Sequence, residues 1–455
     1  MRQNSDFSKV PSSPRQFGIY IEGEMLPAKS GKRTVRYSPA HDCPVTEIAQ
    51  AGIEDVDLAV ASARQSFDNK VWSGKSGAER ASVLLKAAAL IRERQSEIAY
   101  WETLESGKPI SQTNGEVAGC ADMFEYASGL ARTINGESYN NLGEQLFGIV
   151  TREPIGVVGL ITPWNFPFLI LCERVPYILA AGCTIVTKPS EYTSATTLIL
   201  AEILTAAGLP NGAMNVVTGP GSIVGQAICE NPQIDMISFT GSTAVGKNVI
   251  CACGETNFKK LGLELGGKNP QIVFSDANLD DAADGVAFGM CFNTGQCCVS
   301  GSRLLVERSV MSKFNELLKE KLSKVIVGDP LNPSTQMGAI TTEAQNATIL
   351  SYIEKGQVEG AEITFGSGKI KTENGQFVGP VIFENVRPEM SIFRDEIFGP
   401  VISVTPFDTV EEAIMLANDT DYGLAASVWS KNVDKVLQVS RNVKAGRFWA
   451  NTTLA

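Results

Sequence analysis

Short β-rich runs alternate with helical patterns from Ile155 onward, and this alternation limits the possible folds more than any other feature of the sequence. The runs read IGVVGLIT, CTIVTK, MNVVTG, DMISFTG and NPQIVF. Parallel strands need crossover connections, which are usually helices, so the pattern predicts a parallel sheet. The helix expected at 194–207 has an ordinary stop signal, with Gly208 directly after it and Pro210 beyond.

A second series of the same kind occupies the C-terminal part of the chain. It consists of a strand RLLVE at 303–307, a helix near 310–324, a strand VISVTPF at 401–407 and a helix that begins at Thr409. The chain has 455 residues, which is enough for roughly two to four domains. The two series therefore predict an α/β protein with two open parallel-sheet domains.

The residues before Ile155 predict helices followed by a small β element. One amphipathic helix is expected to bury Val56, Val60, Ala63 and Phe67. A second helix begins at the capping box Ser76-Gly-Ala-Glu79. Its expected inward residues are Leu84, Leu85, Ala88 and Ile91. The polar segment 136–154 predicts a hairpin.

Composition narrows the function. With 39 basic and 50 acidic residues the formal charge is −11, which argues against a nucleic-acid partner. The polar N-terminus lacks the apolar core of a signal peptide, and no run approaches the roughly 18 apolar residues of a membrane helix. The sequence thus predicts a cytoplasmic protein that has no membrane partner.

A single histidine, His41, restricts the chemistry further. It excludes a multi-histidine metal site, and we expect His41 to be an exposed loop residue. The ten cysteines are too dilute for a disulfide scaffold and are expected to be reduced. We therefore predict no metal, and proton transfers that rest on carboxylates, lysines or thiols.

The first candidate for chemistry is the pair Cys297-Cys298 in FNTGQCC. A buried cysteine is usually inert. Here Gly295 permits a close backbone approach, and polar residues surround the thiols. This context favours a nucleophile.

The second candidate is Glu264 in LELGGK. A carboxylate between leucines is expected to be partly buried, and burial raises the pKa of a carboxyl group toward that of a general base. The alternative is a glutamate paired with Lys268 at a turn between strands.

Two glycine turns and an asparagine complete the candidates. The turn Gly219-Pro-Gly221 to Gly225 and the turn Gly241 to Gly246 lie where a strand leads into a helix, a position that favours phosphate. Neither fits the GxGxxG fingerprint of dinucleotide-binding folds, and the alternative for each is an ordinary tight turn between a strand and a helix. Asn165, in PWNFP after the first β-rich run, can donate to an oxyanion or simply occupy a turn.

The chain resembles the aldehyde dehydrogenase superfamily from about residue 20 to the end. The resemblance rests on six motifs, which occur in the family's order: PWNFP, KPSE, GSTAVG, LELGGK, FNTGQCC and DEIFGP. The separation of 34 residues between Glu264 and Cys298 is that of the hydrolytic members. The resemblance is strongest to betaine aldehyde and amino aldehyde dehydrogenases.

The resemblance implies a role for each matching residue. Cys298 would be the nucleophile, Glu264 the general base, and Asn165 an oxyanion donor together with the backbone N–H of Cys298. The residues expected to bind NAD are Trp164, Lys188, Glu191, Gly221, Gly225, Thr240, Gly241, Ser242, Glu396 and Phe398. Those expected to contact the substrate are Phe168, Glu173, Phe292 and Cys297.

The implied reaction is oxidation of an aldehyde to a carboxylic acid with NAD, through a thiohemiacetal and a thioester on Cys298. Betaine aldehyde or another amino aldehyde is the expected substrate. A semialdehyde, a general aliphatic aldehyde, a redox-free thiol esterase and a catalytically silent structural or binding homologue remain as alternatives.

The resemblance also implies a Rossmann-like NAD-binding domain at 1–135 and 155–266, an oligomerisation hairpin at 136–154 and a catalytic domain at 267–455. We expect a homodimer or a homotetramer. Family members usually continue for several tens of residues past Ala455, so either the sequence is a fragment or the tail is lost. Without the tail, the hairpin would have an unpaired edge.

Overall fold

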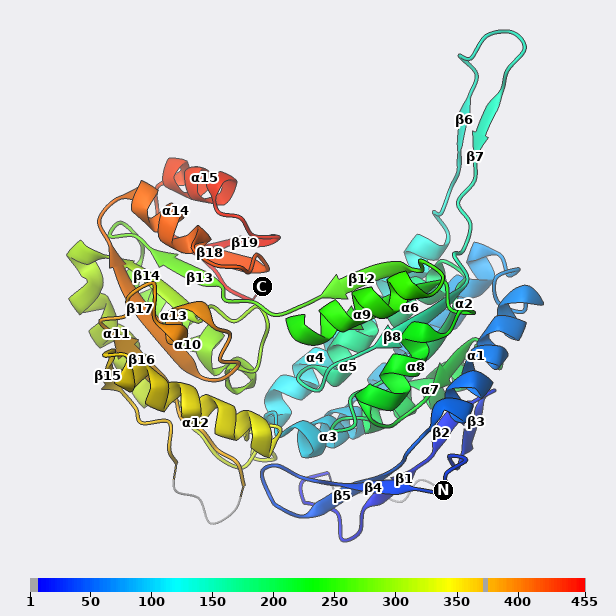
Figure 1. The fold of residues 1–455 in the computed structure, drawn as a ribbon, viewed down its shortest axis with the longest axis horizontal. Helices are drawn as coiled ribbons and strands as arrows, with labels where there is room; N and C mark the ends of the chain where they lie inside the picture. The colour runs from blue at the N-terminus through cyan, green and yellow to red at the C-terminus, as the bar shows by residue number, and fades with distance from the viewer. Residues whose placement is uncertain (1–6, 371–374, 455) are drawn as a thin grey trace. The chain divides into compact units, whose positions relative to one another are not determined.

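A computed structural model describes residues 7–370 and 375–454 (Figure 1). The chain forms two compact units. The first comprises the residues up to Tyr37, Pro44–Glu105 and Thr113–Glu264. The second comprises Ser38–Cys43, Ser106–Gln112 and Leu265–Ala455. Among the described residues, no helix is both long and apolar enough to span a bilayer.

The first unit is built on a seven-stranded sheet of order β12-β11-β8-β9-β10-β2-β3. Its strands are β2 (Ile19–Ile21), β3 (Glu24–Leu26), β8 (Val157–Ile161), β9 (Thr184–Lys188), β10 (Met214–Val216), β11 (Met236–Thr240) and β12 (Lys260–Glu264). The five strands from β12 to β10 run parallel, whereas β2 and β3 are antiparallel. The predicted parallel sheet is confirmed, and four of the five β-rich runs form it.

Helices connect these strands and cover the sheet. They are α1 (Ile53–Asp68), α2 (Gly77–Glu93), α3 (Gln95–Ser106), α4 (Ile110–Ala131), α5 (Pro167–Cys172), α6 (Val175–Ala180), α7 (Ala195–Ala207), η1 (Gly221–Gly225), α8 (Gln226–Glu230) and α9 (Thr243–Glu255). The helix α7 ends as predicted, because Gly208 adopts φ +100°.

The predicted capping box of α2 is present, with Ser76 accepting from Glu79 N and Glu79 accepting from Ser76 N. The residues of α2 that were predicted to face inward are buried, with the exception of Leu85, which is 50% exposed. Leu84, Ala88 and Ile91 already fill one face of the helix, and position 85 lies beside that face. In α1, Phe67 is only half-buried, while the other three predicted residues are buried.

Two small sheets belong to the first unit. One contains β1 (Arg15–Phe17), β4 (Arg33–Tyr37) and β5 (Pro44–Ala49). The other is the predicted hairpin, in which β6 (Glu137–Tyr139) pairs antiparallel with β7 (Gly148–Val150). The hairpin projects from the body of the first unit (Figure 1).

The second unit contains another seven-stranded sheet, of order β15-β16-β17-β14-β13-β18-β19. Its strands are β13 (Pro270–Val273), β14 (Arg303–Glu307), β15 (Glu362–Phe365), β16 (Val381–Glu384), β17 (Val401–Phe407), β18 (Ala425–Trp429) and β19 (Arg447–Ala450). All pairs are parallel except β15 with β16. The run NPQIVF, the last of the first predicted series, therefore belongs to this second sheet as β13.

Alternate residues of the central strands supply two apolar cores, one on each face of the sheet. Ile272 and Leu305 pack in one core, and Val273 and Leu304 in the other. The covering helices are α10 (Leu279–Cys291), η2 (Phe292–Gly295), η3 (Arg308–Val310), α11 (Met311–Ser323), α12 (Glu343–Val358), α13 (Ser391–Arg394), α14 (Val410–Asn418) and α15 (Val433–Asn442).

Candidate active site

A left-handed turn precedes the cysteine pair of the second unit. Asn293, Thr294 and Gly295 have φ values of +46°, +55° and +71°. A left-handed conformation costs a non-glycine residue about 1–2 kcal/mol, so the surrounding bonds must hold the turn. The Nδ2 of Asn293 donates to Gln296 O at 3.1 Å, and the Nε2 of Gln296 donates to Asn293 O at 3.1 Å.

Further bonds anchor the same turn to the rest of the unit. Gln296 Oε1 accepts from Thr341 N at 2.9 Å, and Thr294 Oγ1 donates to Gly338 O at 3.2 Å. A Cβ on Gly295 would lie 2.3 Å from the carbonyl carbon of Gly399. The predicted close backbone approach at Gly295 is thereby confirmed, and only glycine fits there.

Cys298 follows this turn as a half-buried thiol, whereas Cys297 is 6% exposed. A hydrogen bond with the Cys297 thiol lowers the pKa of Cys298 below that of an ordinary thiol. Burial and the Glu396 carboxylate oppose this effect, and the backbone N–H of Val299 supports it. Because the thiolate is the nucleophilic form, the site favours a reactive Cys298.

Glu396 lies in the loop between α13 and β17 and contacts the segment that leads into β13. Its Oε1 accepts from Gly267 N at 3.0 Å, and a Cβ on Gly266 would lie 2.2 Å from its Oε2. Burial raises the pKa of Glu396. Phe398 has φ +56°, and Gln345 holds this loop by donating to the carbonyls of Ile397 at 2.9 Å and Phe398 at 3.0 Å.

In the first unit, the predicted site residues gather at the carboxyl ends of the parallel strands. Asn165 follows β8, Lys188 ends β9, Thr240 ends β11 and Glu264 ends β12. Ile161 pairs with Lys188, and Thr240 pairs with Glu264, so these ends form one edge of the sheet. Ligands of open α/β sheets bind at this edge.

The charged pair at the end of β9 has one buried and one exposed member. The Nζ of Lys188 lies 3.5 Å from Glu191 Oε2, and its side chain is 3% exposed against 42% for Glu191. Burial lowers the pKa of Lys188, and the carboxylate of Glu191 opposes that change. Lys188 also donates to Pro189 O at 2.7 Å.

Both predicted glycine turns lead from a strand into a helix. Gly221 and Gly225 bound the π-helical turn η1, which continues into α8. Gly241 N donates to Glu264 O at 3.0 Å. The Ser242 hydroxyl caps α9 by accepting from Val245 N at 3.3 Å.

The predicted burial of Glu264 is wrong. Its side chain is 52% exposed, and its Oε1 lies 3.7 Å from Arg174. The physical reason is that Glu264 is the last residue of β12, an edge strand that the sequence patterns did not reveal. The alternative pairing with Lys268 is also wrong, because Lys268 is fully buried and its amine has no hydrogen-bond partner among the described residues.

The remaining predicted residues differ in their exposure. Asn165 is 3% exposed and Phe168 is completely buried, with its N–H donating to Glu102 Oε2 at 3.2 Å. Trp164 and Glu173 are half-buried in the same unit. In the second unit the half-buried ring of Phe292 packs on Phe288, with their centroids 5.3 Å apart.

Comparison with known proteins decides the family. The chain matches the aldehyde dehydrogenase family model over residues 26–455. This chain belongs to the aldehyde dehydrogenase family. The family and enzyme class predicted from the six motifs are confirmed.

Individual relatives cover nearly the whole chain. Aldehyde dehydrogenase family 2 member C4 of Arabidopsis thaliana is 42% identical over 95% of this chain and 86% of its own length. Betaine aldehyde dehydrogenase of Bacillus subtilis (strain 168) is 39% identical over 95% and 89%. The crystal structure of an NAD-dependent aldehyde dehydrogenase from Sinorhizobium meliloti is 47% identical, with a TM-score of 0.97 over 99% and 89%.

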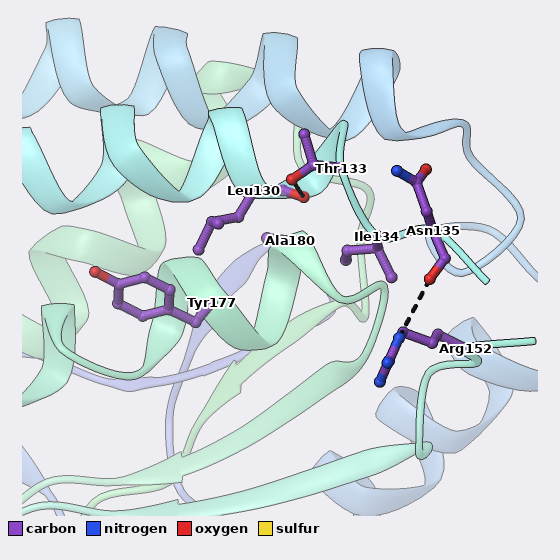
Figure 2. Close-up of a pocket in the computed structure, with 7 residues that line it drawn as sticks. All are labelled: Leu130, Thr133, Ile134, Asn135, Arg152, Tyr177 and Ala180. Atoms are coloured by element: carbon purple, nitrogen blue, oxygen red, sulfur yellow. Dashed lines mark hydrogen bonds between the residues drawn. The ribbon is translucent and has the colours of Figure 1, made fainter. Parts of the chain in front are cut away.

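His41 and a pocket beside the hairpin involve none of the residues assigned above. His41 is not exposed as predicted: its side chain is 19% exposed, and its Nε2 lies 2.9 Å from Asp329 Oδ1. No cluster of three potential metal ligands occurs among residues 7–370 and 375–454. A pocket of about 320 Å³ at the base of the hairpin contains none of the predicted site residues; Arg152 donates to Asn135 O across one side of it (Figure 2).

The thiol environments predict an order of reactivity. Iodoacetamide should modify Cys298 at lower pH than the exposed Cys251, because the pKa of Cys298 is lowered and the thiolate is the attacking form. Buried Cys291, whose pKa burial raises to about 12, should stay unmodified in the folded protein. Peptide mass spectrometry after timed labelling measures this order, and faster labelling of Cys251 below neutral pH would contradict it.

Proposed function

We propose that this chain oxidises a cationic amino aldehyde, such as betaine aldehyde, to its carboxylic acid through a covalent intermediate on Cys298. The chain is an NAD-dependent aldehyde dehydrogenase. The covalent intermediate is supported chiefly by the half-buried Cys298 thiol. Its pKa is lowered, and it follows a left-handed turn that is held by hydrogen bonds.

Cys298 begins the reaction as a thiolate. Its sulfur adds to the carbonyl carbon of the aldehyde, the C=O π electrons move onto oxygen, and a thiohemiacetal oxyanion results. Asn165 and the backbone N–H of Cys298 donate to this oxyanion, and each such donor contributes about 3 kcal/mol. As the oxyanion collapses to a thioester, the carbon loses a hydride, for which bound NAD would be the acceptor.

Glu264 completes the reaction by removing a proton from water. The water oxygen attacks the thioester carbon, the C–S bond breaks, and the acid leaves while Cys298 is restored as a thiolate. The Glu264 carboxylate is accessible to water, and the guanidinium of Arg174 lies 3.7 Å from it. We assign Glu264 as this base on its place at the end of β12.

Each unit contains residues that suit one part of NAD. The N-terminus of α9 at Ser242 and the turn at Gly221 to Gly225 suit its phosphates. Lys188 and Glu191 together suit the hydroxyls of the adenosine ribose. The Glu191 carboxylate would repel the 2′-phosphate of NADP. In the second unit, Glu396 and Phe398 would hold the nicotinamide ribose.

The substrate assignment rests on charge near the proposed oxyanion donor. Glu173 directly follows α5, the short helix that begins at the last residue of the PWNFP motif, and is half-buried. The neighbouring Arg174 directs its guanidinium to Glu264 and to the backbone carbonyl of Glu173. A carboxylate in this position favours a cationic aldehyde, and the relative from Bacillus subtilis is named a betaine aldehyde dehydrogenase.

We further propose a homodimer or a homotetramer in the cytoplasm. The two-stranded hairpin has no other strand beside it among the described residues, and it exposes Leu146, Phe147 and Ile149 by 64–67%. Exposed apolar edges of this kind are usually covered by another chain. All ten cysteines are free, which suits a reducing compartment.

Two substitutions test the covalent route. Cys298→Ala should abolish NADH formation, because no other group supplies the nucleophile. Glu264→Gln should release about one equivalent of NADH in a rapid burst and then stall, because thioester hydrolysis lacks its base. Stopped-flow absorbance at the NADH band measures both, with Cys251→Ala as the control that keeps full activity. Steady turnover by Cys298→Ala would refute the proposal.

A substrate panel tests the preference for a cation. We expect the highest kcat/KM for betaine aldehyde or 4-aminobutanal, ahead of hexanal and succinic semialdehyde. Glu173→Gln should lower kcat/KM for betaine aldehyde about fivefold, since one partly screened charge contact contributes about 1 kcal/mol. Hexanal is the matched control, because its oxidation should not change. A preference for succinic semialdehyde would overturn the cationic assignment.

A further inference from the structure

A buried asparagine in the second unit binds the backbone of Cys298. Asn269 is 3% exposed and immediately precedes β13. Its Nδ2 donates to Cys298 O and to Ser300 O, both at 2.8 Å. Its Oδ1 accepts from Ala425 N, the first residue of β18, at 3.0 Å. Both amide hydrogens and the amide oxygen of Asn269 are thus engaged with main-chain groups.

The segment that carries Asn269 also contacts Glu396. Gly267 N donates to Glu396 Oε1 at 3.0 Å, while a Cβ on Gly267 would lie 2.4 Å from Cys298 O. The same short segment therefore contacts the main chain of the proposed nucleophile and the carboxylate proposed to hold the nicotinamide ribose. The buried strand β13 follows it directly.

The main chain before Cys298 and the carbonyl of Cys298 itself are held by different groups. The turn at Asn293 to Gly295 fixes the chain before it. After it, the Cys298 carbonyl is fixed by Asn269. Because the positions of N, Cα and C determine the direction of the Cα–Cβ bond, a shift of this carbonyl redirects the sulfur. Misplacement by about 1 Å is enough to slow an enzyme about a hundredfold.

We propose that Asn269 is a positioning residue, which aims the Cys298 thiol by holding its carbonyl. This inference rests on the proposed function, in which Cys298 is the nucleophile. No sequence motif marks Asn269 for this role, because its partner at Cys298 lies 29 residues away.

Substitutions at Asn269 test the proposal against a matched control. Asn269→Ala removes both donors, Asn269→Ser keeps one shorter donor, and Asn269→Asp places a carboxylate against two carbonyl oxygens. Asn315→Ala is the control, since Asn315 is 2% exposed in the same unit and its amide has no hydrogen-bond partner among the described residues. Each variant is assayed for kcat, for KM of NAD and aldehyde, and for the pH profile of Cys298 alkylation by iodoacetamide.

We expect Asn269→Ala to lower kcat and the limiting alkylation rate by about ten- to a hundredfold, with KM for NAD changed by less than about twofold. Asn269→Ser should retain part of both rates. Asn269→Asp should move the alkylation profile to higher pH, because an added negative charge disfavours the thiolate. Asn315→Ala should match the wild type in all of these measurements.

Unchanged kcat and alkylation in Asn269→Ala would overturn the proposal. A loss confined to KM for NAD would also overturn it, because Asn269 would then act through Glu396. If Asn269→Ala fails to fold, Asn269→Ser decides by the same criteria. Turnover by Cys298→Ala would instead refute the proposed function. If Cys298 is required but the Asn269 variants keep the wild-type kcat and alkylation rate, this inference alone is refuted.

Discussion

The proposed active site depends on a backbone conformation that most residues avoid. Asn293, Thr294 and Gly295 are all left-handed, and Cys298 follows three residues after them. The cost of about 1–2 kcal/mol for each of the two non-glycine residues is similar to the gain from a few hydrogen bonds of about 1 kcal/mol each. The reciprocal amide bonds of Asn293 and Gln296 supply such compensation. Strain of this kind is often retained where a functional group must be presented in one orientation.

Opposing effects determine the pKa of the Cys298 thiol. Burial and the Glu396 carboxylate disfavour the thiolate, while Cys297 and the backbone N–H of Val299 favour it. The net result is a lowered pKa of Cys298 that owes nothing to a histidine. Because Glu396 is itself bound to Gly267 N, the charge that most directly opposes the thiolate occupies a fixed place. The groups that lower or raise the pKa of Cys298 therefore all belong to the second unit.

Local patterns in the sequence predicted the capping box of Ser76 and the C-cap at Gly208, because each cap depends on neighbouring residues alone. They also predicted most of the strands, but not that β13 belongs to the second sheet, since pairing joins distant segments. The exposure of Glu264 was not predictable in this way, since it depends on β12 lying at the edge of its sheet. The half-buried environment of His41 depends on Asp329, which is distant in sequence.

The same limit applies to residues that support the site. The amide of Gln345 binds carbonyls 52 and 53 residues away, and Asn269 binds a carbonyl 29 residues away. Such side chains donate hydrogen bonds to carbonyl groups that are distant in the sequence and come close to them only when the chain folds. The six motifs identified the groups proposed to react, whereas the side chains that hold them required the structure.

Substitution of Gly295 by alanine tests the central claim most directly, because the added Cβ would lie 2.3 Å from Gly399 C. Gly360→Ala is the matched control, since Gly360 has φ +94° and a Cβ added there would have nothing within 4 Å. We expect Gly295→Ala to lower aldehyde oxidation and Cys298 alkylation by about a hundredfold, while Gly360→Ala retains both. Wild-type rates in Gly295→Ala would show that this turn does not govern the thiol.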